Sequence, residues 1–197
     1  MPTRPLVYAD NPILRRKSHR VEKVTPALRS LIEDMIETMR AANGIGLAAI
    51  QIGVPERVIV VELPAEADED EEEEEGEAEA RPKQLYVVIN PEIRRASAEM
   101  EEGVEGCLSV PGWAGEVPRH LAVTVKGMDI KGKPVRLKAE GLLARVLQHE
   151  IDHCDGILFI DRIEDPEKIW QVTAGEEEAA EASQERPGGP RGPVPAE

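Results

Sequence analysis

Two histidines and a glutamate stand at a spacing that suits hydrolysis assisted by a metal ion. His149 and His153 are four residues apart, and Glu150 directly follows the first of them. On an α-helix this spacing places both imidazoles on one face, about 6 Å apart along the helix axis. Two imidazoles so placed can bind one divalent metal, and Glu150 is then well placed to handle the protons of water on that metal. The segment therefore predicts a metal-dependent site with hydrolytic chemistry.

The residues around these histidines have the pattern of a largely buried helix. Apolar residues recur there at helical spacing, at Leu142, Leu143, Val146, Leu147 and Ile151. Gly156 follows the histidines as a helix stop signal. Polar side chains in a buried helix are costly unless they are satisfied, and a metal would satisfy both imidazoles.

The third protein ligand of such a site stays open on spacing alone. Catalytic zinc-type sites usually take three protein ligands and leave one position for water. Asp161 and Glu164 are downstream carboxylates of the kind that helix-borne peptidases use. Cys107 lies upstream, and its thiolate would bind Zn²⁺ or Fe²⁺ well, although a small buried core residue is the other interpretation. Cys154 directly follows His153 and points off the face that carries both histidines.

The composition indicates one well-cored domain with unusual acidic additions. At 197 residues the chain is long enough for one domain plus tails, and its 3% aromatic content means an aliphatic core. The net charge of −15 depends on the run 66–79, whose eleven acids leave −4 on the rest of the chain. We expect this run to be a solvated loop between two paired strands, because like charges repel and cannot pack.

Several classes of protein are disfavoured by the same numbers. No basic start precedes a long apolar run, and no stretch approaches about 20 apolar residues, so we expect neither a signal peptide nor a membrane span. Two cysteines in such a chain predict no structural disulfide, and we expect a cytoplasmic protein. Lys and Arg number 24 against 39 Asp and Glu, so no nucleic-acid-binding surface is evident and specific DNA binding is not expected.

The elements that must position the histidines follow from capping and periodicity. Residues 10–15 have the composition of a turn and an extended lead-in. A helix is expected to begin at Thr25 and Pro26, carry an apolar stripe to Met39 and end at Asn43–Gly44. Strands rich in Val and Ile are expected at residues 57–63, 85–90, about 93–100, 121–128 and 134–138, with a hairpin turn at 129–133.

A final helix is expected to begin near Pro166 and to carry Ile169, Trp170 and Val172. The order of elements predicts the α+β class. We expect mixed, mainly antiparallel sheets packed around a buried metal-bearing helix, with an N-terminal and a C-terminal helix.

Three segments together resemble, in order and identity, the three signature motifs of peptide deformylases. They are residues 44–51 (GIGLAAIQ), 105–109 (EGCLS) and 148–153 (QHEIDH). The likeness extends over most of residues 4–173. It implies a catalytic domain over residues 1–173 with the acidic insert at 65–80, followed by a flexible acidic and Pro/Gly-rich tail at 174–197.

The resemblance implies an enzyme that removes the formyl group from the N-terminal formyl-methionine of nascent polypeptides and releases formate. It implies that Cys107, His149 and His153 hold one divalent metal, generally Fe²⁺, in whose place Zn²⁺ or Ni²⁺ is often found. The implied partners are formyl-methionyl N-termini and, transiently, the ribosome, with the protein itself a monomer. Because an acidic tail matches RNA phosphates poorly, docking through that tail is in doubt.

The resemblance also gives catalytic roles to three further residues. Glu150 would take the water proton and return a proton to the departing amine. The side-chain NH₂ of Gln51 and the backbone NH of Leu108 would stabilise the negative oxygen of the tetrahedral intermediate.

The substrate is expected to be an extended peptide that carries a methionine side chain. Backbone groups of Ile45, Gly46 and Gly106 would hold it as an added strand beside the site. Ile45, Leu142 and Val146 are the candidates for an apolar slot, and plain core packing is the other interpretation of these three.

Three further charged residues lie near the motifs, and two of them are expected to support the metal ligands. Arg145 lies in the apolar stretch before His149 and is expected to reach solvent. Glu105 and Asp152 would pair with neighbouring groups and orient the metal ligands.

Two other classes of protein share the histidine motif. An ordinary zinc peptidase would use His149, His153 and a downstream carboxylate, so Cys107→Ser would leave its activity unchanged. A non-enzymatic protein with a structural metal would leave no open coordination position, and Glu150→Gln would have no hydrolysis to remove.

Overall fold

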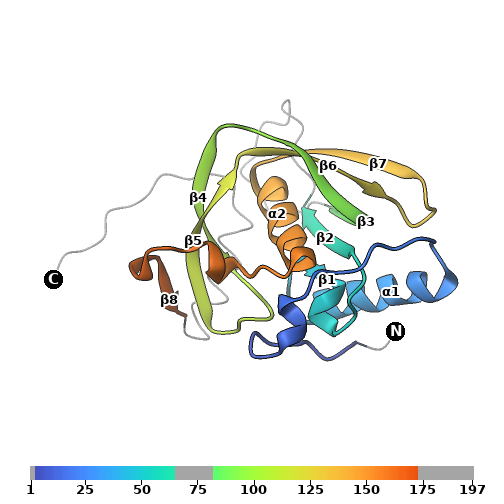
Figure 1. Ribbon diagram of the computed structural model, residues 1–197, viewed down its shortest axis with the longest axis horizontal. Helices are drawn as coiled ribbons and strands as arrows, with labels where there is room; N and C mark the ends of the chain where they lie inside the picture. Colours follow the sequence, from blue (N-terminus) through green and yellow to red (C-terminus); the bar gives the residue numbers. More distant parts are fainter. Residues whose placement is uncertain (1–2, 65–81, 173–197) are drawn as a thin grey trace, which may run out of the picture.

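Two antiparallel sheets surround one central helix (Figure 1). The computed structural model describes residues 3–64 and 82–172. The larger sheet has the strand order β1 (Gly46–Ala48), β2 (Val58–Pro64), β3 (Lys83–Ala96), β6 (Ala122–Met128) and β7 (Pro134–Glu140). The smaller sheet has the order β4 (Met100–Gly106), β5 (Trp113–His120) and β8 (Ile169–Gln171). This arrangement confirms the predicted α+β class.

The larger sheet is covered on both faces by helices. Helix α2 (Gly141–Asp155) packs against one face and α1 (Pro26–Ala41) against the other. Strand β2 shows the reason, because its residues alternate between two apolar clusters: Ile59 and Val61 pack in the cluster with α2, and Val58 and Val60 in the cluster with α1. A strand buried on both faces reads as a continuous apolar run rather than an alternating one.

Helix α1 forms as its sequence predicts. The Thr25 side chain accepts a hydrogen bond from the Leu28 backbone NH at 3.2 Å, and Pro26 occupies the first turn. The helix ends at Ala41, just before Asn43, whose φ of 54° lies in the left-handed region. Its buried apolar residues are Leu28, Leu31, Ile32, Met35 and Met39.

Two predicted hairpins are also confirmed. Strands β2 and β3 pair in register from Val58 opposite Ile89 to Pro64 opposite Lys83, and the acidic run that connects them lies outside the described residues. Strands β6 and β7 are joined by the turn at 129–133. There the Asp129 side chain accepts hydrogen bonds from the backbone NH groups of Lys131 and Lys133, each at 2.8 Å.

The strand predicted at about 93–100 is wrong as a separate element. Residues 93–96 belong to β3, which runs to Ala96, and Met100 begins β4 in the other sheet. The pairing of β3 with β6 shifts register between Ile89 and Glu92, and again between Ile93 and Arg95. Such irregularities bend a strand without ending it, so β3 continues where the sequence pattern suggested a break.

The predicted C-terminal helix is also wrong. Pro166–Lys168 forms a single 3-10 turn, and Ile169–Gln171 forms β8, which pairs with β5 from Trp113 to Gly115. The backbone groups at this edge of β5 gain partners from β8, and this tertiary pairing overrides the local helical pattern.

The lead-in at 10–15 differs in a smaller way. Pro12–Arg15 forms a 3-10 helix instead of an extended segment. The Asn11 side chain caps it by accepting a hydrogen bond from the Ile13 NH at 3.0 Å, and Arg15 forms an ion pair with Asp161. The local cap and this distant ion pair together hold the turn.

Helix α2 ends at a glycine that no other residue can replace without strain. Gly156 has a φ of 78°, and a Cβ placed there would lie 2.6 Å from the backbone oxygen of Arg15. We expect Gly156→Ala to lower the free energy of unfolding by at least about 1–2 kcal/mol, because left-handed geometry and this close approach both oppose a side chain. Denaturant unfolding of the two proteins measures the difference, and equal midpoints would contradict it.

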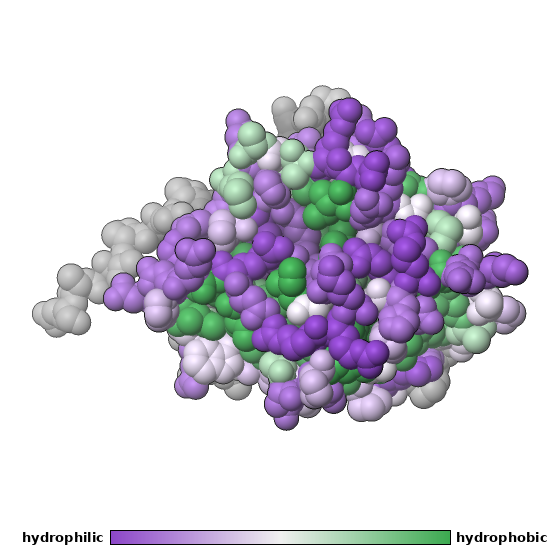
Figure 2. All heavy atoms as spheres, in the orientation of Figure 1, coloured by the Kyte–Doolittle hydropathy of each residue, from purple (hydrophilic) through white to green (hydrophobic). Residues whose placement is uncertain are grey.

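Hydrophilic residues cover most of the face shown in Figure 2, with apolar residues visible between them in patches. Within residues 3–64 and 82–172, no helix is long and apolar enough to cross a bilayer.

Candidate active site

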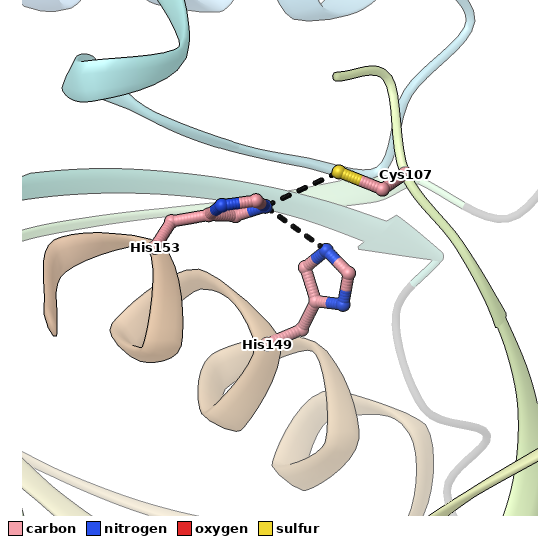
Figure 3. Close-up of side chains that lie close together, drawn as sticks. All are labelled: Cys107, His149 and His153. Atoms are coloured by element: carbon pink, nitrogen blue, oxygen red, sulfur yellow. Dashed lines mark hydrogen bonds between the residues drawn. The ribbon is translucent and has the colours of Figure 1, made fainter. Parts of the chain in front are cut away.

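One thiol and two imidazoles lie close together where the segment after β4 meets α2 (Figure 3). Cys107 directly follows β4, whereas His149 and His153 project from successive turns of α2. The Cys107 Sγ lies 3.3 Å from the His153 Nε2, which lies 3.2 Å from the His149 Nε2. One ligand atom from each of the three residues lies within 4.8 Å of the other two. The two histidines on α2 therefore face a cysteine that follows a strand of the smaller sheet.

This donor set fits a divalent metal. Thiolate sulfur and imidazole nitrogen are the ligand types that Zn²⁺ and Fe²⁺ take in proteins. The His149 Nδ1 lies 2.9 Å from the Glu105 Oε2, and an ionised carboxylate can only accept, so Nδ1 carries the proton and Nε2 is left as the ligand atom. His153 is fully buried, and its Nε2 also faces inward toward the other two donors.

The downstream carboxylates do not join this cluster. Asp161 accepts a hydrogen bond from the Leu158 backbone NH at 2.8 Å and pairs with Arg15. Among the described residues, the one cluster of metal-ligand type is Cys107, His149 and His153, which excludes both Asp161 and Glu164. The geometry thus favours the cysteine over the carboxylates as the third ligand.

A buried ionic network holds His149 on the side away from Cys107 and His153. The guanidinium of Arg119, on β5, donates to the two carboxylate oxygens of Glu105 at 2.8 and 2.9 Å and also pairs with Asp152. Burial alone would raise the pKa of Glu105, but hydrogen bonds from Arg119 and His149 outweigh it and hold the pKa well below its usual value. Glu105 therefore stays ionised and keeps the proton of His149 on Nδ1.

Arg119 was missed by sequence reasoning, and Arg145 was misplaced by it. Strand β5 was not predicted, and so the burial of Arg119 on the same face of the strand as Val117 was not foreseen. Arg145 was expected to reach solvent, but its side chain is only 14% exposed and its Nη1 lies 3.0 Å from the Glu105 Oε1. The available signal for Arg119 was its spacing from Val117, because residues two positions apart in a strand lie on the same face.

Gln51 lies directly beside the cysteine. Its Oε1 accepts a hydrogen bond from the Ala48 backbone NH at 2.8 Å, which fixes which way the amide points. Its Nε2 lies 3.2 Å from the Ser109 Oγ and 3.7 Å from the Cys107 Sγ. Because Gln51 is 1% exposed, its amide NH₂ is a fixed donor at the edge of the donor cluster.

Glu150 is buried beside the cluster without a full set of partners. Its Oε2 has no hydrogen-bond partner among the described residues. Burial is the main cause that raises the pKa of this carboxyl to about 7. Gly46 on β1 gives Glu150 its space, because a Cβ at Gly46 would lie 2.9 Å from the Glu150 Cδ. A carboxyl group in this state can exchange protons near neutral pH.

A cleft of about 750 Å³ opens onto this site. Glu150, His149 and Cys107 are among the residues that line it. All five residues predicted to bind substrate line this cleft: Ile45, Gly46, Gly106, Leu142 and Val146. Leu108 lines it as well. The cleft therefore joins β1, β4 and the first turns of α2 around the candidate catalytic groups.

The fold and this donor set together are those of a hydrolase with a candidate metal centre. The sequence profile described as "Polypeptide deformylase" matches residues 3–169. The peptide deformylase of Thermomicrobium roseum is 50% identical over 183 residues, covering 93% of this chain and 98% of that protein. The chain belongs to the peptide deformylase family.

Solved structures agree with this assignment. The crystal structure of peptide deformylase from Ehrlichia chaffeensis is 36% identical, with a TM-score of 0.71, and the match covers 92% of this chain and 94% of that one. A class I type b peptide deformylase from Acinetobacter baumannii, solved with Met-Ala-Ser bound, is 35% identical with a TM-score of 0.71, covering 82% of this chain and 99% of that one. The chain is accordingly a hydrolase of the family that removes N-terminal formyl groups from nascent formyl-methionyl peptides.

Proposed function

We propose that Cys107, His149 and His153 hold one divalent metal for this reaction, natively Fe²⁺, with Zn²⁺ or Ni²⁺ able to replace it. The observation that carries the proposal is the convergence of the Cys107 Sγ and both Nε2 atoms beside Glu150. When bound, such an ion acts as a Lewis acid and lowers the pKa of water to about 7. The soft thiolate and the two imidazoles suit Fe²⁺, Zn²⁺ and Ni²⁺ in the same coordination set.

Glu150 is proposed as the group that moves protons. It would take a proton from the attacking water and later donate one to the departing amine, because an unprotonated amide nitrogen is a poor leaving group. Its burial, its place in the cleft and an Oε2 without a partner in residues 3–64 and 82–172 support this role.

Gln51 and Leu108 are proposed to stabilise the oxygen that becomes negative in the tetrahedral intermediate. The Gln51 NH₂ is oriented toward Cys107 by the hydrogen bond between its Oε1 and the Ala48 NH. The backbone NH of Leu108 directly follows Cys107, and Leu108 lines the cleft. Each such donor could lower the barrier by about 3 kcal/mol.

The substrate is proposed to lie in the cleft as an extended chain. Backbone groups of Ile45, Gly46 and Gly106 would hold it between β1 and β4, and Leu142 and Val146 would form the slot for the methionine side chain. The Met-Ala-Ser bound to the Acinetobacter baumannii relative is the peptide that deformylation of formyl-Met-Ala-Ser would leave.

The remaining assignments follow from the substrate. A nascent chain is met at the ribosome, so we propose a transient contact with the ribosome. We also propose that the protein is a cytoplasmic monomer and that residues 1–173 form its catalytic unit. The acidic insert at 65–80 and the tail at 174–197 fall outside the described residues. Size-exclusion chromatography with light scattering tests the monomer, and a stable dimer would contradict it.

Formate release tests the function directly. Anaerobically prepared protein, with its metal content measured in parallel, is expected to release formate from formyl-Met-Ala-Ser and to stop when a chelator removes the metal. Readdition of Fe²⁺ should restore the rate. Protein fully loaded with Fe²⁺ that releases no formate would contradict the proposed function.

A further inference from the structure

Arg145 turns from α2 toward the smaller sheet. Its Nη1 donates to the Val117 backbone oxygen at 2.8 Å, to the Gly103 oxygen at 3.3 Å and to the Glu105 carboxylate at 3.0 Å. Its Nη2 donates to the Glu101 oxygen at 2.8 Å. Three of these acceptors are on β4 and one is on β5. The guanidinium is thus anchored across the space between α2 and the two strands.

Gly103 provides the space that this guanidinium fills. A Cβ at Gly103 would lie 2.7 Å from the Arg145 Cζ and 2.7 Å from its Nη2. Atoms do not approach so closely without displacement. A side chain at position 103 and the anchored guanidinium therefore exclude each other. The two positions therefore form one interlocked contact between β4 and α2.

The same arginine lines the substrate cleft. Leu142, Arg145, Val146 and His149 follow one another at i, i+3, i+4 and i+7 on α2, and all four line the cleft. Leu142 and Val146 are apolar, and Arg145, next to Val146 in the helix, is the cleft residue of α2 whose side chain is bonded to β4. Its methylene stem can bound an apolar slot while its charged end is held by the strands.

We propose that Arg145 is the end wall of the methionine slot and limits the length of the side chain that the enzyme accepts. The inference rests on the slot in the proposed function and adds a specificity-determining residue to it. The anchored guanidinium cannot swing aside without leaving the Glu101, Gly103 and Val117 carbonyls with one donor fewer. Arg145 therefore behaves as a fixed wall, unlike an unanchored surface side chain.

Substrates that differ by one methylene test this wall. The ratio of kcat/KM for formyl-ethionyl-Ala-Ser to kcat/KM for formyl-Met-Ala-Ser is expected to rise about tenfold or more in Arg145→Ala, because the slot becomes deeper. The matched control is Arg57→Ala, which removes another arginine with 14% side-chain exposure and a carboxylate partner, Asp155, remote from the cleft. The control is expected to keep the wild-type ratio.

Gly103→Ala tests the same wall without removing it. The added methyl group must push the guanidinium away from β4 toward the slot, so the ethionyl-to-methionyl ratio is expected to fall. If Arg145→Ala does not fold, this variant decides the proposal. A ratio unchanged from wild type in every folded variant would overturn it, because a merely structural arginine would change stability and leave selectivity unaltered. The wild-type rate with formyl-Met-Ala-Ser reports separately on the activity itself.

Discussion

Glu150→Gln is expected to lower kcat by about 10²- to 10⁴-fold while the protein keeps its full metal content. Glutamine has nearly the same shape as glutamate, so the packing around Gly46 is preserved. It cannot accept a proton from water, and therefore both proton transfers assigned to Glu150 lose their carrier. The buried Oε2 has no hydrogen-bond partner among the described residues, so the change breaks no bond seen at that atom.

Formate release and metal analysis on the same preparation measure this result. Glu102→Gln is the matched control, because it makes the same chemical change at an exposed carboxylate on β4 that pairs with Lys168. The control should retain the wild-type rate. A Glu150→Gln protein with undiminished turnover would remove Glu150 from the mechanism, and one that has lost its metal would show that the residue acts through the metal site instead.

Cys107→Ser is expected to weaken metal binding by more than about 100-fold and to reduce formate release to near background. Loss of a partner that only supports a metal ligand already costs about 10- to 100-fold in affinity, and Cys107 is proposed as a ligand itself. Serine is smaller, and its hydroxyl does not ionise near neutral pH, so it replaces neither the reach nor the charge of the thiolate.

Chelator competition measures the metal affinity independently of activity. Cys154→Ala is the matched control: Cys154 is buried on α2, burial raises the pKa of its thiol to about 12, and it lies outside the donor cluster. The control is expected to keep its metal. Retention of both metal and activity by Cys107→Ser would instead favour a peptidase-like site with a different third ligand.

Local patterns predicted the parts of the fold whose causes are local. The Thr25 cap, the apolar stripe of α1 and the turn at Asp129 depend on residues within a few positions of each other, and all three are present. The errors fall where distant pairing decides the outcome. Residues 169–171 form β8 because the edge of β5 is beside them, and β3 continues to Ala96 through register shifts that are set by β6.

The candidate site divides in the same way. The spacing of His149 and His153 put both imidazoles on one helical face, since helix geometry alone fixes that relation. The sequence by itself could not choose between Cys107 and a downstream carboxylate, which required the resemblance in the motifs and then the convergence seen in the structure.

The sequence therefore determined the family, the helix that carries the histidines and the identity of the reactive groups, because these depend on residue type and short spacing. Only the tertiary structure decided which buried charges face one another. Arg119 and Arg145 come from different elements and meet at Glu105, more than ten residues away from either along the chain. A buried carboxylate accepts such partners because an unpaired charge in the interior is costly, and that cost acts through space rather than along the sequence.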